Sequence, residues 1–194
     1  KLSDTEIFSG LEDFHSHILP GVDDGVSKIE ESLQILRLYE SLGVRKLWLT
    51  PHIMEDIPNS TVALMDKFEN LKANYSGPIE LRLAAEYMLD SLFISRLESK
   101  DLLPLGDEKQ YLLVETSFWV GSNILYEMLQ QIFSSGFFPV LAHPERFGYM
   151  TEDDYDRLLS MGVKFQLNIP SLMGLYGMAA QKVADALLQK GAYS

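Results

Sequence analysis

The stretch Glu12-Asp13-Phe14-His15-Ser16-His17 closes an apolar run that starts at Leu11, and Pro20-Gly21-Val22-Asp23-Asp24-Gly25 follows it. In an extended strand alternate side chains point to the same side, so we expect His15 and His17 to face one way. Two carboxylates come within a turn of this pair. Taken alone, such histidines are as often a solvent-facing pair, and Asp-Asp-Gly is most often a turn. Taken together, they are typical of metal ligands gathered at the end of a strand.

The remaining histidines lie in similar contexts. The sequence has four histidines, and the other two stand in Thr50-Pro51-His52 and Ala142-His143-Pro144-Glu145-Arg146. Each follows an apolar, strand-like run, so no histidine is left for ordinary surface or core positions. The pattern indicates a metal site assembled from several strand ends, and therefore a hydrolase.

Two glutamates extend this pattern. Glu86 follows an apolar run that ends at Ala84, and Glu115 follows Leu112-Leu113-Val114 directly. Singly, either glutamate could cap a segment or end a strand in solvent. That every such residue should stand at the carboxyl end of a strand by chance is improbable, so we interpret them as one constellation. Mixed histidine and carboxylate sets suit manganese, iron or zinc better than magnesium or calcium, and a bridging carboxylate can hold two metals together.

Strand-like and helical runs alternate along the whole chain. Apolar runs of strand length occur at 11–14, 46–50, 79–84, 111–114, 138–142 and 164–168. Between them, apolar residues at helical spacing share faces, as do Val62, Met65, Phe68 and Leu71. Ser27-x-x-Glu30 and Thr151-x-x-Asp154 resemble capping boxes that open helices. Glycines that close helical runs stand at Gly43, Gly77, Gly136, Gly162 and Gly191.

This alternation predicts an α/β fold with a parallel sheet, either open or closed into a barrel. A barrel gathers the carboxyl ends of all its strands on one face, whereas an open sheet brings together only those beside a switch point. Six candidate side chains from five consecutive strands favour the barrel. The sequence has no Gly-x-Gly-x-x-Gly or Walker loop, which argues against nucleotide binding. We therefore predict one TIM-like barrel domain over residues 1–194.

Composition narrows the classes of function. The chain has 194 residues, 46% hydrophobic and 23% charged, which suits one globular domain. The absence of cysteine excludes thiolate ligands and a cysteine nucleophile. A net charge of -12 disfavours nucleic-acid binding. No segment approaches the apolar length of a membrane span, and residues 1–10 do not resemble a signal peptide. We expect a cytoplasmic protein that binds no nucleic acid and does not insert into a membrane.

The combined motifs resemble the polymerase-and-histidinol-phosphatase (PHP) superfamily, and more narrowly its capsule-associated tyrosine-protein phosphatases. The resemblance runs from about Leu11 to the end of the chain. It is carried by His15-x-His17, Leu19-Pro20-Gly21-x-Asp23-Asp24-Gly25, Thr50-Pro51-His52, Ala85-Glu86-Tyr87, Leu113-Val114-Glu115 and Ala142-His143-Pro144-Glu145-Arg146. The whole set is specific, whereas the His-x-His pair alone is weak. The resemblance implies a distorted TIM-like (β/α)7 barrel with up to three divalent metal ions, manganese first, with iron and zinc as alternatives.

The resemblance also implies a role for each motif residue. The implied metal ligands are His15 and His17 for a first ion, Glu86 as a bridge, Glu115 and His143 for a second ion, and Asp24 and His52 for a third. Arg146 matches the arginine that contacts substrate phosphate. A guanidinium group suits that role because it offers two parallel donors to phosphate oxygens.

The sequence departs from the family pattern at its end. The family carries a final Asp-x-His on its last strand, with ligands for the first and third ions. This sequence stops at Gly191-Ala192-Tyr193-Ser194, where that strand would begin. We therefore expect a barrel truncated before its last strand, with the second ion site best preserved. An unpaired edge also favours association between chains, so a homo-oligomer is one expected state.

The leading hypothesis is a metal-dependent phosphomonoesterase that acts on phosphotyrosine in protein. The resemblance would place the substrate on a membrane-associated bacterial tyrosine kinase of capsular or exopolysaccharide synthesis. The expected reaction is attack on phosphorus by a metal-activated hydroxide, with the metals and Arg146 neutralising the developing charge. Three alternatives stay open. They are hydrolysis of a small ester such as histidinol phosphate, a DNA-processing role that the net charge disfavours, and a non-catalytic binding or regulatory module with a degraded metal site.

Overall fold

The computed structural model describes residues 8–108, 110–117 and 122–193, and within them strands and helices alternate as the sequence predicts. The strands are β1 (Glu12–Asp13), β2 (Lys46–Leu49), β3 (His52–Ile53), β4 (Glu80–Leu83), β5 (Glu86–Met88), β6 (Tyr111–Glu115), β7 (Phe138–Ala142) and β8 (Lys164–Gln166). The helices are α1 (Ile29–Leu42), α2 (Thr61–Asn74), α3 (Ser91–Ser99), α4 (Ser122–Ser134), the 3-10 turn η3 (Pro144–Arg146), α5 (Glu152–Ser160), α6 (Ile169–Leu172) and α7 (Gly177–Gln189).

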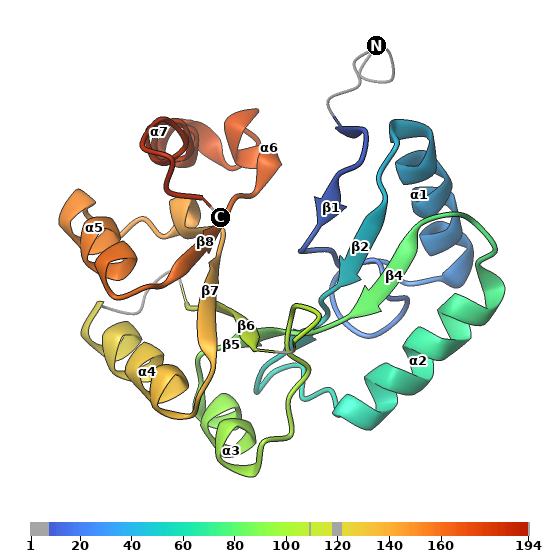
Figure 1. The fold of residues 1–194 in the computed structure, drawn as a ribbon, viewed down its shortest axis with the longest axis horizontal. Coiled ribbons are helices and arrows are strands. Elements are labelled where there is room, and N and C mark those ends of the chain that lie inside the picture. The colour runs from blue at the N-terminus through green and yellow to red at the C-terminus, as the bar shows by residue number, and fades with distance from the viewer. Residues whose placement is uncertain (1–7, 109, 118–121, 194) are drawn as a thin grey trace.

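The strands pair in parallel and form an arc with the helices on its outer side (Figure 1). One sheet has the order β1-β2-β4 and the other the order β3-β5-β6-β7-β8. The predicted parallel α/β fold is confirmed. The described strands do not close into a barrel, because no ladder joins β8 to β1 across the open side of the arc. The seven-unit barrel therefore stays a prediction.

The chain bends between β2 and β3 and again between β4 and β5, and these bends divide the strands into two sheets. β2 and β3 are separated by Thr50 and Pro51, and proline has no N–H with which to continue a ladder. Hydrogen bonds still follow the chain through the bend, from the Ala84 amide to the Leu49 carbonyl (2.9 Å) and from the Glu86 amide to the Pro51 carbonyl (3.1 Å). His52 and Glu86 are therefore the first residues of new strands, in register with each other, rather than loop residues after old ones.

The core lies between the arc and its helices, and the apolar strand residues fill it. Leu49, Leu112, Leu141 and Phe165 are fully buried, and Leu129 packs against them from α4. Burial of this kind stabilises the fold by about 1.5 to 3 kcal/mol for each large apolar side chain. No helix in the described part of the chain is both long and apolar enough to cross a membrane.

Three local predictions need correction. On α2 the buried residues are Thr61, Leu64, Phe68 and Leu71, whereas Val62 and Met65 are exposed. Helix α1 opens one residue later than predicted, since the Lys28 amide donates to the Glu31 carboxylate. Gly77 does not end a helix, because α2 stops at Asn74.

The other predicted helix ends are confirmed. Thr151 and Asp154 form the predicted capping box at the start of α5. The helix-ending glycines that have positive φ are Gly43, Gly136, Gly162 and Gly191.

Candidate metal centre

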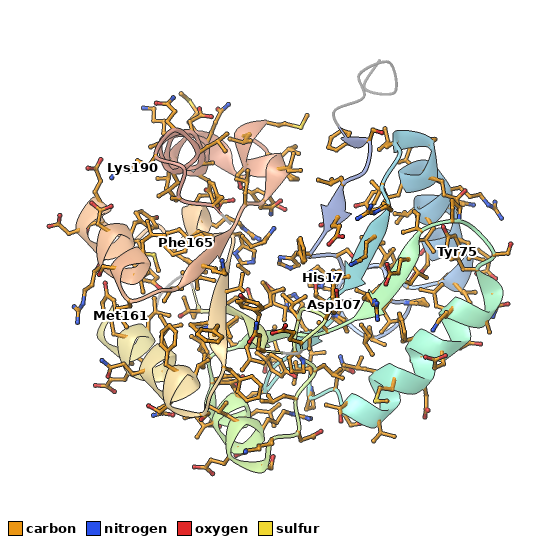
Figure 2. The ribbon with its side chains drawn as sticks, viewed as in Figure 1. His17, Tyr75, Asp107, Met161, Phe165 and Lys190 are labelled. Atoms are coloured by element: carbon orange, nitrogen blue, oxygen red, sulfur yellow. The ribbon has the colours of Figure 1, made fainter. Side chains whose placement is uncertain are left out.

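The predicted site residues gather in one pocket of about 500 Å³ inside the arc. Figure 2 shows His17 turned toward the middle of the arc. The pocket is lined by His15, His17, Asp24, His52, Glu86, Glu115, His143 and Arg146, together with Ser16, Ile18, Tyr39, Gln166, Asn168 and Tyr176. Every candidate residue that the sequence singled out therefore lines the same cavity.

Ser16 explains why His15 and His17 both face the cavity. Its side chain points the other way, and its hydroxyl donates to the Trp48 carbonyl (2.9 Å). Its amide donates to the hydroxyl of Thr50 (3.0 Å), and the Thr50 amide donates back to the Ser16 carbonyl (2.8 Å). The extended backbone beyond β1 is thus fixed against the end of β2. Alternation then turns both neighbouring imidazoles inward.

Glu86 is the centre of the cluster. Its carboxylate is fully buried, and all four histidines of the sequence lie within 3.2 Å of it. Oε2 is 3.0 Å from His15 Nε2, 3.2 Å from His17 Nε2 and 3.2 Å from His52 Nδ1, while Oε1 is 3.0 Å from His143 Nε2. A carboxylate with both oxygens engaged in this way has the geometry of a bridging ligand.

The outer nitrogens of His15 and His17 are held by acceptors. His15 Nδ1 lies 2.9 Å from Gln166 Oε1, and His17 Nδ1 lies 2.9 Å from Asp23 Oδ2. Gln166 Oε1 also accepts the His143 amide (3.3 Å), which fixes it as the oxygen. Each Nδ1 must therefore carry a proton, and in the neutral imidazole each Nε2 presents a lone pair to Glu86. Such outer partners fix the tautomer of metal-binding histidines.

The spacing of the inner atoms fits a divalent metal. Bonds of about 2.0 to 2.2 Å in tetrahedral or octahedral geometry place neighbouring ligand atoms about 2.8 to 3.6 Å apart. His15 Nε2, His17 Nε2 and Glu86 Oε2 are 3.0, 3.0 and 3.2 Å from one another. The buried Nδ1 of His52 lies 3.1 Å from Glu115 Oε1 and 3.2 Å from Glu86 Oε2, yet its geometry makes a hydrogen bond with neither. The donor set therefore fits the metals that the sequence predicts.

Three groups of candidate ligand atoms each converge within 4.8 Å. They are His15, His17 and Glu86; His17, Asp24 and His52; and His52, Glu86 and Glu115. His143 Nε2 also lies near both carboxylates, 3.0 Å from Glu86 Oε1 and 3.7 Å from Glu115 Oε2. The predicted sharing of Glu86 agrees with these distances. The assignment of each ligand to a particular ion stays a prediction.

Charge within the cluster alters its acid–base behaviour. Burial alone would raise the pKa of Glu86, but the charge of His15 and the hydrogen bonds from the surrounding imidazoles hold this pKa well below its ordinary value. Burial likewise opposes protonation of His17, yet hydrogen bonds to Asp23 and Glu86 raise its pKa to about 10. When no cation is bound, protons on the histidines balance the buried carboxylates.

This balance predicts a stability profile for the metal-free protein. A histidine pKa raised from 6.5 to about 10 contributes stability that is fully present below pH 6.5 and is lost as the pH rises toward 10. We expect the free energy of unfolding of the chelator-treated protein to fall between pH 6.5 and 9. Urea unfolding across this range measures it. The slope should flatten in His17→Gln, and an equal slope in that variant would contradict the prediction.

His143 has an unusual backbone. It lies in the left-handed region, with φ 35° and ψ 52°, directly before Pro144. Few residues other than glycine adopt this region, and it costs about 1 to 3 kcal/mol. Its amide donates to the Gln166 carbonyl (2.9 Å), so the end of β8 holds the residue in place. The sharp turn aims the imidazole at Glu86 and leads at once to Arg146.

Arg146 lines the pocket from the turn η3. Its guanidinium carbon is 4.2 Å from the centroid of the Tyr176 ring. Stacking of this kind holds the planar group in one orientation. The arrangement places a cation in the same pocket as the histidine and carboxylate cluster, and its contact with substrate phosphate stays a prediction.

Sequence reasoning missed two supporting residues. Asp23 lies in the motif Leu19-Pro20-Gly21-x-Asp23-Asp24-Gly25, which predicts no role for it; its buried carboxylate accepts from His17 and from the His52 amide (3.1 Å). Gln166 was not singled out at all. The available signal was a polar residue within the last apolar run, 164–168, close to the end where the other site residues stand.

Removal of the Gln166 acceptor should weaken metal binding. We expect Gln166→Leu to lower manganese affinity about 10- to 100-fold, the usual effect of losing an outer partner of a histidine ligand. Isothermal titration calorimetry measures this affinity. Gln166→Glu keeps an acceptor and should retain more of it, while Gln181→Leu, on α7, serves as the control. An unchanged affinity in Gln166→Leu would reject the role.

Comparison with known proteins places the chain in a family. The family profile for capsular polysaccharide synthesis, CpsB/CapC, matches residues 11–193. Tyrosine-protein phosphatase CpsB of Streptococcus pneumoniae is 31% identical over 166 residues, covering 80% of this chain and 66% of its own length. Tyrosine-protein phosphatase YwqE of Bacillus subtilis is 27% identical over 171 residues, covering 85% and 67%. CapC of Staphylococcus aureus is 27% identical over 184 residues, covering 90% and 70%.

A solved structure has the same fold. A chain from the crystal structures of YwqE from Bacillus subtilis and CpsB from Streptococcus pneumoniae, described as unique metal-dependent tyrosine phosphatases, superposes with a TM-score of 0.84. It is 24% identical, and the match covers 94% of this chain and 76% of that one. The family profile, the relatives and the fold agree. The chain therefore belongs to the CpsB/CapC family of capsular polysaccharide synthesis.

Proposed function

We propose that the protein is a metal-dependent protein-tyrosine phosphatase of capsular polysaccharide synthesis. The observation that carries this proposal is the convergence of all four histidines within 3.2 Å of the buried Glu86 carboxylate. Its family membership and the names of its relatives support phosphotyrosine over a small phosphate ester as the substrate. The absence of cysteine leaves no route through a thiol nucleophile.

The residues of the pocket have separable tasks. His15, His17, Asp24, His52, Glu86, Glu115 and His143 would hold the metal ions, of which manganese is our first choice. Bound divalent cations would neutralise charge on the phosphoryl group. They would also lower the pKa of a water molecule, so that hydroxide is available to attack phosphorus. Arg146 would bind two phosphoryl oxygens through its planar fork. Gln166 and Asp23 would hold a proton on the outer nitrogens of His15 and His17, so that the inner nitrogens face the metal ions.

The proposal extends to the setting of the enzyme. The arc of parallel strands is compatible with a distorted TIM-like (β/α)7 barrel, in which ligands from successive strands surround one mouth. We propose that the substrate is phosphotyrosine on a membrane-associated bacterial tyrosine kinase, and that the reaction takes place in the cytoplasm. The net charge of -12 disfavours nucleic acid as an alternative substrate.

Turnover of p-nitrophenyl phosphate by the full chain tests the proposed function. Turnover should be stimulated by added manganese and abolished by a chelator, and a phosphotyrosine peptide should be hydrolysed faster than histidinol phosphate. Metal content per chain is measured on the same sample. No metal-stimulated release of nitrophenol would reject the proposal, and release without bound metal would reject its mechanism.

A further inference from the structure

The segment from Leu167 to Gln181, which runs from β8 through α6 into α7, has an unusual surface. It contains no charged residue, in a chain whose net charge is -12. Five of its large side chains are nonetheless exposed: Ile169 (44%), Met173 (68%), Leu175 (70%), Tyr176 (45%) and Met178 (73%). We call these five residues the apolar rim. Exposed apolar residues that occur singly are ordinary, whereas five so close in sequence make this segment a candidate interaction surface.

The apolar rim meets the candidate metal centre at Tyr176. Tyr176 belongs to the rim and also lines the pocket, as does the neighbouring Asn168. The Tyr176 ring stacks on Arg146, the residue expected to bind phosphate. Tyr176 therefore links the expected phosphate-binding residue to the exposed apolar side chains beside it in the sequence.

The apolar rim and the loop after β1 differ in the charge that they bring to the pocket. The loop after β1 contributes Asp24, whose side chain is 79% exposed and lies 3.6 Å from His52 Nε2. Asp24 and His52 are expected to hold a metal ion, so this side of the pocket belongs to the metal site rather than to the rest of the substrate. The apolar rim carries no charge and adjoins a guanidinium, and is the favourable side for the rest of the substrate.

We propose that the apolar rim binds apolar or aromatic residues that flank phosphotyrosine in the protein substrate. This inference rests on the proposed function and deepens it, because it names which peptides the site prefers. Methionine side chains suit the task, since their flexible thioethers adapt to different apolar partners. The pocket then recognises the phosphorylated side chain, and the apolar rim recognises its sequence context.

Peptide binding tests the inference without depending on turnover. A fluorescent peptide with a non-hydrolysable phosphotyrosine analogue flanked by leucine and phenylalanine is titrated with the manganese-loaded full chain. The double variant Met173→Ser, Leu175→Ser should raise Kd about tenfold, through lost burial of apolar surface. The matched control is Val62→Ser, Met65→Ser, which removes two similarly exposed apolar side chains from α2 and should leave Kd unchanged. A peptide in which glutamates flank the phosphotyrosine analogue should bind more weakly, and its Kd should change less in the rim variant.

Four outcomes would overturn the inference. One is an equal Kd in the rim variant and the unsubstituted protein. A second is an equal effect of the control variant. A third is that light scattering finds the unsubstituted protein and the control variant to be dimers but the rim variant to be a monomer. The apolar rim would then be an interface between copies of the chain. The fourth is a Tm that falls in the rim variant but not in the control, which means that the side chains are packed in solution. Turnover of p-nitrophenyl phosphate is measured separately, so that failure of the proposed function is distinguished from failure at the rim.

Discussion

Replacement of Glu86 by glutamine is expected to abolish metal binding and turnover while the fold is retained. The substitution keeps the shape of the side chain but removes the charge that four imidazoles surround. Loss of an outer partner of a metal ligand costs about 10- to 100-fold in affinity, so loss of the bridging ligand itself should cost at least about a hundredfold. Manganese content after dialysis, together with p-nitrophenyl phosphate turnover, measures the effect.

Glu145 provides the control for Glu86. It is also a buried carboxylate, but it accepts from the Asn168 amide (3.1 Å) and the Tyr193 hydroxyl (3.1 Å) and contacts none of the four histidines within hydrogen-bond distance. Glu145→Gln should lower Tm and retain metal. If Glu86→Gln kept a full complement of manganese, the assignment of a bridging carboxylate would be wrong.

Replacement of Arg146 by alanine is expected to reduce kcat/KM about 100- to 1,000-fold with metal content unchanged. This is the usual effect of removing one group that stabilises charge in a transition state. Arg146→Lys should recover little, because an ammonium group cannot offer two parallel donors to a phosphoryl group. Steady-state kinetics with p-nitrophenyl phosphate, together with metal analysis of each variant, separates this effect from loss of metal.

The chain offers a matched control for Arg146. Arg157 also stacks on a tyrosine, with its guanidinium carbon 3.8 Å from the centroid of the Tyr126 ring, but it does not line the pocket. Arg157→Ala should leave kcat/KM within about twofold, because exposed surface contacts contribute little. Equal losses in the two variants would mean that Arg146 acts through the fold rather than on phosphate.

The parallel fold and the site could be predicted because strand ends and rare residue types coincide. His15, His52, Glu86 and His143 each mark the end or restart of an apolar run, and parallel strands bring such positions to one edge. The family match came from the same motifs. What the sequence could not supply was the partner of each side chain. Gln166 and His15 are far apart in the chain, and nothing local links them.

Other misses have local physical causes. Two neighbouring apolar faces of α2 include Phe68 and Leu71. One continues through Met65 and Val62, and the other, which is buried, through Leu64. Helical spacing alone cannot decide which of these faces is buried; the packing of α2 against the sheet does. The bend at Pro51 was also missed, because β3 is only two residues long and too short for any alternation to be visible.

The single hydrogen bond between His15 and Gln166 has a kinetic consequence. It joins residues 151 positions apart, and no strand ladder in the described part of the chain accompanies it across the open side of the arc. Contacts between residues so distant in sequence form slowly, because the entropy cost of closing the loop comes before the contacts that offset it. We therefore expect secondary structure to develop before the cation-binding pocket during refolding. Stopped-flow mixing should register circular dichroism first and manganese uptake last.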